Sequence, residues 1–206
     1  MRIWMDSKGA LAADHASDLR VRVADASDYR ELWDLYADVC EAMRGTADDC
    51  LWELGVHPSR DDLEKAIAEG NLIVVEGAPC TTSARPGSLA ILGAFVLNDV
   101  QAPGYECASW LVDALPSEVA VIHLLASSSA ARGRGVGRAM LSAAADIARG
   151  RGKRTVRLDV FPNNAPALRL YRSFGFTDVC LQDLALADGS IHELVLMEYA
   201  LEGARG

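Results

Sequence analysis

The sequence lacks the features that mark secreted, zinc-binding and membrane proteins. Its five cysteines include no C-x-x-C pair and no cluster with histidine, so neither a disulfide framework nor a zinc site is expected. No apolar run approaches the roughly 18 residues that a membrane-spanning helix needs. The first residues contain no uninterrupted apolar core behind a basic head, as a signal peptide would. We therefore expect a cytoplasmic protein with reduced thiols, no metal and no membrane partner.

The chain is also poor in positive charge. Its 20 Lys and Arg residues against 29 Asp and Glu give a net charge of −9, which argues against nucleic-acid binding. Half of the 206 residues are hydrophobic, enough for a substantial core in one domain of ordinary size. We expect residues 1–17 to be a flexible leader or a short added element, and residues 18–203 to form a single domain.

Hydrophobic periodicity predicts alternating strands and helices. Strands are expected at 19–24, 71–77, 88–98, 118–127, 153–161, 175–186 and 191–201. Helices are expected at 25–43, 58–70, 135–150 and 163–174. Residues 98–117 show no clear pattern. This mixed order predicts a layered α/β sheet.

A glycine-rich segment, "SSSAARGRGVGRAML" at 127–141, falls between a predicted strand and a predicted helix. The start of a helix exposes unpaired backbone N–H groups and the positive end of its dipole. Glycines let such a backbone approach a ligand closely. Together these properties predict an anion site, most naturally for a phosphate or diphosphate, on Arg132, Gly133, Arg134, Gly135, Val136, Gly137 and Arg138.

The charge around this segment points the same way. Residues 131–157 contain eight basic residues and one acid, Asp146, a local reversal that suits a polyanionic ligand. The segment is not a P-loop, because no Gly-Lys-Ser/Thr closes it. Two other interpretations are a glycine-rich turn before a solvated basic helix and a regulatory domain that binds a different nucleotide.

A second motif follows the first. Arg132-x-x-Gly135-x-Gly137 and then Asn164-x-x-Ala167-x-x-Leu170-Tyr171 and Gly175-Phe176 resemble the GCN5-related N-acetyltransferase (GNAT) superfamily. The resemblance covers about residues 19–200 in element order, and its specific part is about 118–177. It implies a mixed, mostly antiparallel central sheet of about seven strands, splayed after the fourth, with helices on both faces. It also implies acetyl-CoA as co-substrate.

The resemblance assigns residues to that co-substrate. The diphosphate would lie on the loop Arg132–Arg138. The pantetheine arm would pair with the backbone at Leu125, Ala126 and Ser127, as an added strand does. A backbone N–H there would polarise the thioester carbonyl. Asn164 would lie near the pantetheine, although asparagine is equally well suited to capping the helix that follows it.

Catalytic roles also follow from the resemblance. A tyrosine at the position of Tyr171 protonates the leaving thiolate in this family, whereas the simpler interpretation is a core aromatic residue. The stretch "HLLAS" is similar to a strand of arylalkylamine N-acetyltransferases, where a histidine at the position of His123 helps to remove a proton. The alternative is a sheet histidine bonded to the backbone. Glu118 is the second candidate base, acting through water, and a water chain alone is the third.

These expectations lead to a predicted function. The chain is expected to move an acetyl group to a primary amine by direct attack in a ternary complex, on a small molecule. The acceptor side would come from the first two helices, their connecting loop and residues 98–117. Residues 25–76 hold 14 acids and four bases, which form either a rim for a cationic amine or solvated helix faces. The alternatives are a non-catalytic acyl-CoA sensor and a protein N-terminal or lysine acetyltransferase. A homodimer is possible.

Overall fold

The structure, a computed structural model, describes residues 19–80, 87–186 and 189–201. The leader expected at 1–17 lies outside these ranges. The strands are β1 (Arg20–Val23), β2 (Leu72–Gly77), β3 (Ala90–Asn98), β4 (Val119–Ser127), β5 (Thr155–Val160), β6 (Thr177–Ala185) and β7 (Ile191–Ala200). The α-helices are α1 (Tyr29–Met43), α2 (Arg60–Ala68), α3 (Val136–Gly150) and α4 (Ala165–Phe174). Each of these elements lies inside the range that periodicity predicts for it.

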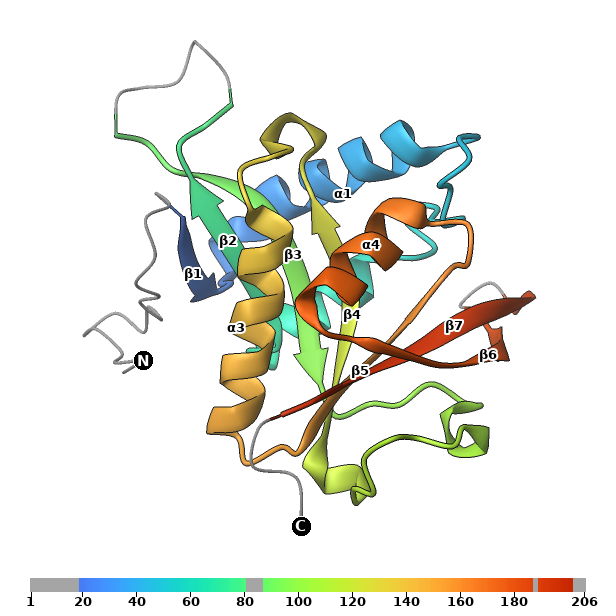
Figure 1. Ribbon diagram of the computed structural model, residues 1–206. Helices are drawn as coiled ribbons and strands as arrows, with labels where there is room; N and C mark the ends of the chain where they lie inside the picture. The colour runs from blue at the N-terminus through green and yellow to red at the C-terminus, as the bar shows by residue number, and fades with distance from the viewer. Residues whose placement is uncertain (1–18, 81–86, 187–188, 202–206) are drawn as a thin grey trace.

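The strands form a seven-stranded sheet in the order β1-β2-β3-β4-β5-β7-β6 (Figure 1). All neighbouring strands are antiparallel except β4 and β5. That parallel pair is short, since only Val119–Val121 pair with Thr155–Arg157. Beyond it the two strands part, so the predicted mixed, mostly antiparallel sheet splayed after the fourth strand is confirmed.

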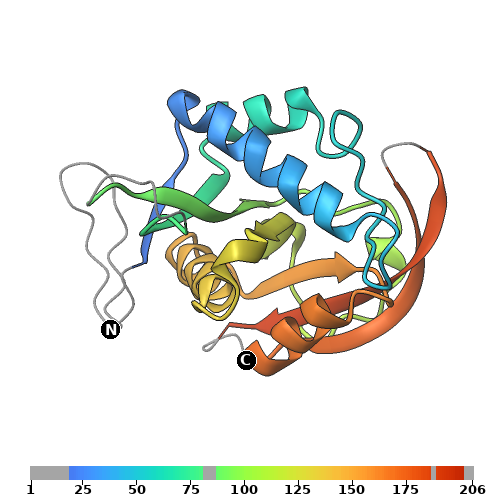
Figure 2. The ribbon, with the colours of Figure 1, turned by 90° about the horizontal axis from the view of Figure 1, so that it is seen from above.

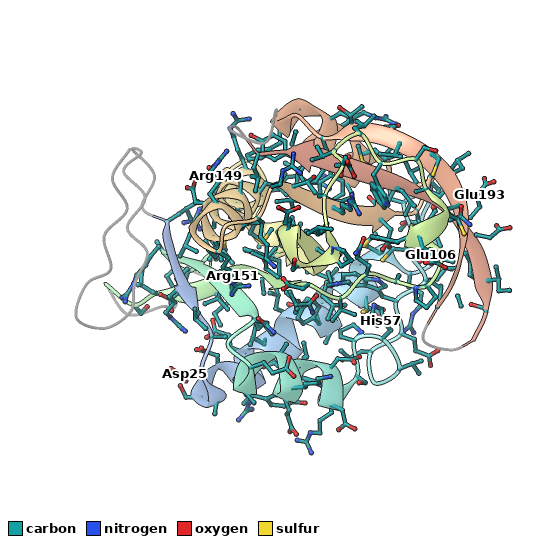
Figure 3. All side chains as sticks on the ribbon, turned by 90° about the horizontal axis from the view of Figure 1, so that it is seen from below. Asp25, His57, Glu106, Arg149, Arg151 and Glu193 are labelled. Atoms are coloured by element: carbon teal, nitrogen blue, oxygen red, sulfur yellow. The ribbon has the colours of Figure 1, made fainter. Side chains whose placement is uncertain are left out.

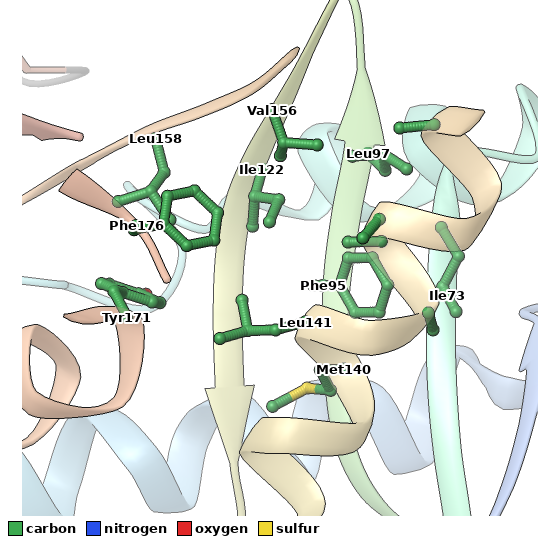
Figure 4. Packing of buried hydrophobic residues seen from close by; sticks show 14 of the residues in the cluster. Ile73, Phe95, Leu97, Ile122, Met140, Leu141, Val156, Leu158, Tyr171 and Phe176 are labelled. Atoms are coloured by element: carbon green, nitrogen blue, oxygen red, sulfur yellow. The ribbon is translucent and has the colours of Figure 1, made fainter. Parts of the chain in front are cut away.

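Helices cover both faces of the sheet, with α1 and α2 on one face and α3 and α4 on the other (Figure 2). Each face has its own apolar core, because successive residues of a strand point to opposite sides. Phe95, Ile122 and Leu158 pack with α3 and α4 (Figure 4). Leu32 and Tyr36 of α1 pack on the opposite face. The sheet thus separates two layers of helices.

The sequence shows no clear pattern over residues 98–117, which connect β3 to β4. In the structure this connection contains two short 3-10 turns, η2 (Tyr105–Cys107) and η3 (Pro116–Glu118). It covers a third apolar cluster, in which Tyr105 is buried with residues of β4, β6 and β7. None of the helices in the described ranges is long and apolar enough to span a membrane.

Candidate functional site

A cavity of about 990 Å³ is lined by the parts of β4 and β5 that do not pair with each other. Its walls also include the loop before α3, the helix α4, the C-terminal part of α1 with the loop after it, and residues of β6 and β7. Most of the predicted site residues lie here: His123, Leu125, Ala126, Ser127, Arg132, Gly133, Gly135, Val136, Gly137, Arg138, Asn164 and Tyr171. The splayed sheet therefore brings residues from distant parts of the sequence to one place.

The loop between β4 and α3 presents main-chain donors to this cavity. It contains the 3-10 turn η4 (Ser129–Ala131), and Gly133 and Gly135 have φ angles of +81° and +78°. A Cβ atom at either glycine would meet nothing within 4 Å, so the backbone there is open. Within the described chain, the N–H groups of Gly133, Gly135 and Val136–Arg138 have no acceptor. Unpaired amides at a helix start form a site suited to an anion.

The third glycine of the motif, Gly137, lies in the first turn of α3 and has a different role. A Cβ atom on Gly137 would lie 2.7 Å from Leu170 Cδ2 of α4. Its absence lets α3 and α4 approach closely at the start of α3. Gly93 does the same on β3, because a Cβ there would lie 2.7 Å from Val136 Cγ1 and 3.0 Å from Met140 Sδ. Gly93 therefore lets the start of α3 pack closely on the sheet, and Gly137 lets it pack closely on α4.

The basic residues of 131–157 are less concentrated on the loop than their spacing predicts. Arg132 and Arg138 line the cavity, whereas Arg134 turns away and donates to the Ala78 carbonyl oxygen at 2.7 Å. The side chains of the other five form hydrogen bonds or ion pairs with residues outside the cavity: Arg149, Arg151, Lys153, Arg154 and Arg157. Arg149 and Arg151 lie far from the cavity residue His57 (Figure 3). Most of the basic residues in 131–157 therefore stabilise the fold and do not face the cavity.

Strand β4 carries a bulge beside the cavity. Ala94 pairs with Ala126 and Val96 with His123, so Leu124 and Leu125 stand opposite one residue of β3. Leu124 has a φ of +51°, a conformation that costs a leucine of order 1–3 kcal/mol. The buried Tyr36 hydroxyl donates to the Leu124 carbonyl oxygen at 2.7 Å and holds the bulge in place. Such bulges re-aim the backbone next to functional sites.

The backbone beyond the bulge is free on one side. β4 pairs with β5 only as far as Val121, while Ala126 and Ser127 pair with β3 on the other side. The cavity-facing edge from Leu125 to Ser127 therefore has room for an extended ligand to add to the sheet.

His123 is held by the loop after β3. Its Nε2 lies 3.1 Å from Asn98 Oδ1 and 3.0 Å from the Val100 carbonyl oxygen. Because a carbonyl oxygen only accepts, we assign the ring proton to Nε2, which leaves Nδ1 as the acceptor of the neutral ring. Burial lowers the pKa of His123, and the nearby carboxylate of Asp159 opposes that shift. The imidazole is therefore neutral at pH 7 with a free basic nitrogen.

Tyr171 and Asn164 bring α4 to the cavity. Asn164 Oδ1 accepts from the Ala167 N–H at 3.2 Å and caps the helix. Tyr171 is 6% exposed and packs in the core beside Phe176 (Figure 4). Its hydroxyl has no hydrogen-bonding partner among the described residues, and Tyr171 is one of the residues that line the cavity. Burial raises the pKa of Tyr171, so the phenol keeps its proton near neutral pH.

Glu118 is not brought to the cavity. It lies at the opposite end of β4, where its Oε2 accepts from the Leu115 N–H at 2.9 Å and lies 3.7 Å from Arg154 Nη1. It therefore serves the turn before β4 and an ion pair.

Asp159 and His57 line the cavity although no motif marks them. Tyr105 Oη donates to Asp159 Oδ2 at 2.8 Å. Burial lowers the pKa of His57. The one sequence signal for Asp159 is that it is the acidic residue of the strand pattern "TVRLDV", which also contains the basic Arg157.

The acceptor side differs partly from the predicted one. α1, the loop 46–57 and Ala102 line the cavity, and α2 does not. Trp52 lines the cavity, whereas Trp33, Tyr36 and Trp110 do not. In the ranges that the structure describes, no group of three or more His, Cys, Asp or Glu side chains is placed to hold a metal ion.

Sequence comparison finds acetyltransferases. A model of the acetyltransferase (GNAT) family matches residues 86–176. Streptothricin acetyltransferase of Streptomyces lavendulae is 45% identical over 62 residues, which are 30% of this chain and 32% of that protein. An uncharacterized N-acetyltransferase of Methanocaldococcus jannaschii is 36% identical over 70 residues, 34% of this chain and 31% of that protein. The matches span about a third of these relatives' length.

Solved structures share the fold. An acetyltransferase of the GNAT family from Streptococcus agalactiae superposes with a TM-score of 0.67 at 19% identity, covering 89% of this chain and 96% of that chain. YncA of Salmonella typhimurium, solved with its cofactor acetyl-CoA, superposes with a TM-score of 0.59 at 20% identity, covering 92% and 98%. At these identities the likeness shows a common fold.

Proposed function

Because a model of the acetyltransferase (GNAT) family matches residues 86–176 and the chain shares the fold of GNAT-family acetyltransferases, we propose that the chain is a member of this family and transfers the acetyl group of acetyl-CoA to a primary amine of a small molecule. The amine attacks directly, in a ternary complex with both substrates. The observation that carries this proposal is the convergence in one cavity of unpaired amides, a free edge of β4 and two groups able to move protons.

The residues present suit acetyl-CoA. The N–H groups of Gly133, Gly135 and Val136–Arg138 would hold the diphosphate, with Arg132 and Arg138 adding positive charge. The open edge from Leu125 to Ser127 would pair with the amides of the pantetheine arm. A backbone N–H beside the bulge would donate to the thioester oxygen as charge develops on it.

Two side chains would handle the protons. An alkylammonium with a pKa of about 10.4 loses its proton at pH 7 at a cost of roughly 4 kcal/mol. His123 Nδ1 would accept that proton, and the amine nitrogen would then form a bond to the carbonyl carbon as the bond to sulfur breaks. The Tyr171 hydroxyl would give its proton to the departing thiolate, and the second proton lost by the amine nitrogen would restore the phenol. No covalent bond to the enzyme is needed. We leave Glu118 out of this scheme because it lies away from the cavity.

The proposal is tested by binding and turnover measured separately. Calorimetry measures acetyl-CoA affinity, and a thiol-reactive dye measures CoA release with a panel of acceptors. Streptothricin belongs in the panel because a protein that resembles part of this chain is named streptothricin acetyltransferase. A peptide with a free N-terminus tests a protein acceptor. We expect micromolar binding and release that depends on a small amine. Binding without release for any acceptor would support a sensor, and absence of binding would contradict the proposal.

The cellular location proposed with this activity is the cytoplasm. All five cysteines are free in the structure, and Cys80 and Cys107 are exposed. Free thiols are the usual state in a reducing compartment.

A further inference from the structure

Asp159 places an uncompensated carboxylate in the cavity. Its Oδ2 accepts from Tyr105 Oη at 2.8 Å, and its Oδ1 has no hydrogen-bonding partner among the described residues. No Lys, Arg or His in the described ranges forms an ion pair with it. A half-buried carboxylate without a cation favours the binding of one.

The nearest basic residue along the strand, Arg157, is committed elsewhere. Its Nε donates to Glu198 Oε1 at 2.9 Å, and the two side chains are only 5% and 1% exposed. The same guanidinium stacks 4.0 Å above the ring of Trp110. The charge of Arg157 is therefore neutralised by Glu198 within the core, and Arg157 does not neutralise Asp159. The Asp159 carboxylate can thus bind a cationic ligand.

This buried ion pair also fixes the residue that holds Asp159. Glu198 Oε2 accepts from the N–H groups of Leu111 and Val112, at 2.6 and 2.9 Å. Trp110 Nε1 donates to the Tyr105 carbonyl oxygen at 2.8 Å. Tyr105 itself is 1% exposed. The connection between β3 and β4 is thus tied to the sheet, and the Tyr105 hydroxyl is aimed at Asp159 before any ligand binds.

The remaining charges of the cavity are divided between its walls. Its positive side chains, Arg132 and Arg138, come from the loop before α3. The other charged lining residues are Asp159 of β5 and two acids of the loop after α1, Asp48 and Glu53. The two histidines of this part, His57 and His123, have lowered pKa values through burial and are neutral at pH 7. Apart from Arg132 and Arg138 of the amide loop, the charged side chains that line the cavity in the described ranges are therefore all negative.

We propose that Asp159 selects the acceptor by its positive charge, and that Tyr105 positions Asp159 for that contact. The carboxylate receives the ammonium group of the incoming amine, which first passes one proton to His123 and then attacks as the free amine. Acceptors are therefore amines that are protonated in solution, and neutral arylamines gain nothing from the contact. This inference rests on the proposed acetyl transfer.

The test compares acceptors that differ in charge. Initial rates at saturating acetyl-CoA are measured with streptothricin and benzylamine, which are cationic at pH 7, and with aniline, which is neutral. We expect Asp159→Asn to raise KM at least about tenfold for the cationic acceptors, the loss typical of a partly buried charge contact. The values for aniline should stay within about twofold of wild type, and Asp159→Glu should recover part of the loss. Asp183→Asn, which removes an exposed carboxylate of β6 outside the cavity, is the matched control.

The Tyr105→Phe variant tests whether Tyr105 positions Asp159, without disturbing the packing that the fold needs. It keeps the ring that packs 5.2 Å from Trp110 and removes only the hydroxyl. We expect KM for the cationic acceptors to rise about threefold or more, with KM for aniline and acetyl-CoA affinity unchanged. This variant also tests the proposal if Asp159→Asn does not fold.

Three results would overturn the proposal while leaving acetyl transfer intact. These are an unchanged KM for the cationic acceptors in both variants, an equal change for aniline, and a wild-type preference for aniline over benzylamine. A wild-type protein that binds no acetyl-CoA, or that acetylates no amine, would contradict the proposed function and this inference together.

Discussion

Replacing Tyr36 by phenylalanine should damage activity from a position outside the cavity. The Tyr36 side chain is fully buried, and its hydroxyl donates to the Leu124 carbonyl oxygen at 2.7 Å. The substitution keeps the ring in the core between α1 and the sheet. It removes only the donor that holds the bulge of β4 in its unusual backbone conformation.

The size of the effect follows from that contact. A buried carbonyl left without its donor costs about 1–3 kcal/mol. The positive φ of Leu124 stores further strain of order 1–3 kcal/mol, so the bulge will relax once the hydrogen bond is lost. Relaxation moves the backbone at Leu125, which would serve the thioester. We expect the free energy of unfolding to fall by about 1–3 kcal/mol and kcat to fall by about 10- to 100-fold, less than the roughly 10²- to 10³-fold loss on removing an oxyanion donor outright, because the donor is displaced and not deleted.

Urea denaturation and CoA-release kinetics measure the two effects. Tyr29→Phe is the matched control, because Tyr29 lies on the same helix and its hydroxyl only accepts from Arg60 Nε at 3.3 Å, an exposed contact. This control should stay within about 0.5 kcal/mol of wild type with unchanged kcat. If Tyr36→Phe has wild-type stability and wild-type kcat, the bulge does not depend on this hydrogen bond.

Three further changes probe the remaining parts of the site. Tyr171→Phe should lower kcat by about 10²-fold or more while acetyl-CoA affinity by calorimetry stays unchanged; Tyr199→Phe, outside the cavity, is its control, and normal turnover would remove Tyr171 as the acid. Gly135→Asp adds bulk and negative charge to the amide loop and should weaken acetyl-CoA binding at least about tenfold. Gly152→Asp, at the other end of α3 with a similar φ of +73°, should not, and equal affinities would argue against the loop assignment. Because burial lowers the pKa of His123 from 6.5, kcat should rise with pH along a limb centred below 6.5, as the imidazolium loses its proton and becomes a base. His123→Gln should abolish that limb, and a limb centred above 6.5 would contradict the role.

Much of the fold follows from local patterns in the sequence. The apolar spacing in α3 and the alternation in β1 predict those elements to within one or two residues, because each buries one face. Gly175 ends α4 with a φ of +119°, as a glycine after a helical pattern predicts. The splay of the sheet came from the family resemblance, because no local pattern encodes where two distant strands stop pairing.

The candidate site, like the fold, is predictable from the sequence only in part. The amide loop is predictable, since glycines before an amphipathic helix signal an open helix start. The charge count around it overestimated the anion site, because sequence proximity does not show that Lys153 and Arg157 have partners in distant segments.

Other features depend on tertiary contacts that the sequence does not display. The bulge is formed by two leucines, and the hydroxyl that bonds to it comes from Tyr36 of a different element. His57 and Asp159 reach the cavity through the packing of a loop and the alternation of β5. Glu118 is adjacent to β4 in sequence but lies at the end away from the bulge, because the direction of the strand decides which end meets the cavity.

The central claim is that main-chain amides at the start of α3 hold the diphosphate of coenzyme A. Its most direct test is a two-dimensional amide NMR titration of the protein with acetyl-CoA and with pantetheine, which lacks the diphosphate. We predict that acetyl-CoA shifts the amide signals of Gly133, Gly135 and Val136–Arg138, whereas pantetheine leaves them in place. Binding of acetyl-CoA without movement of these signals, or equal movement with pantetheine, would contradict the claim.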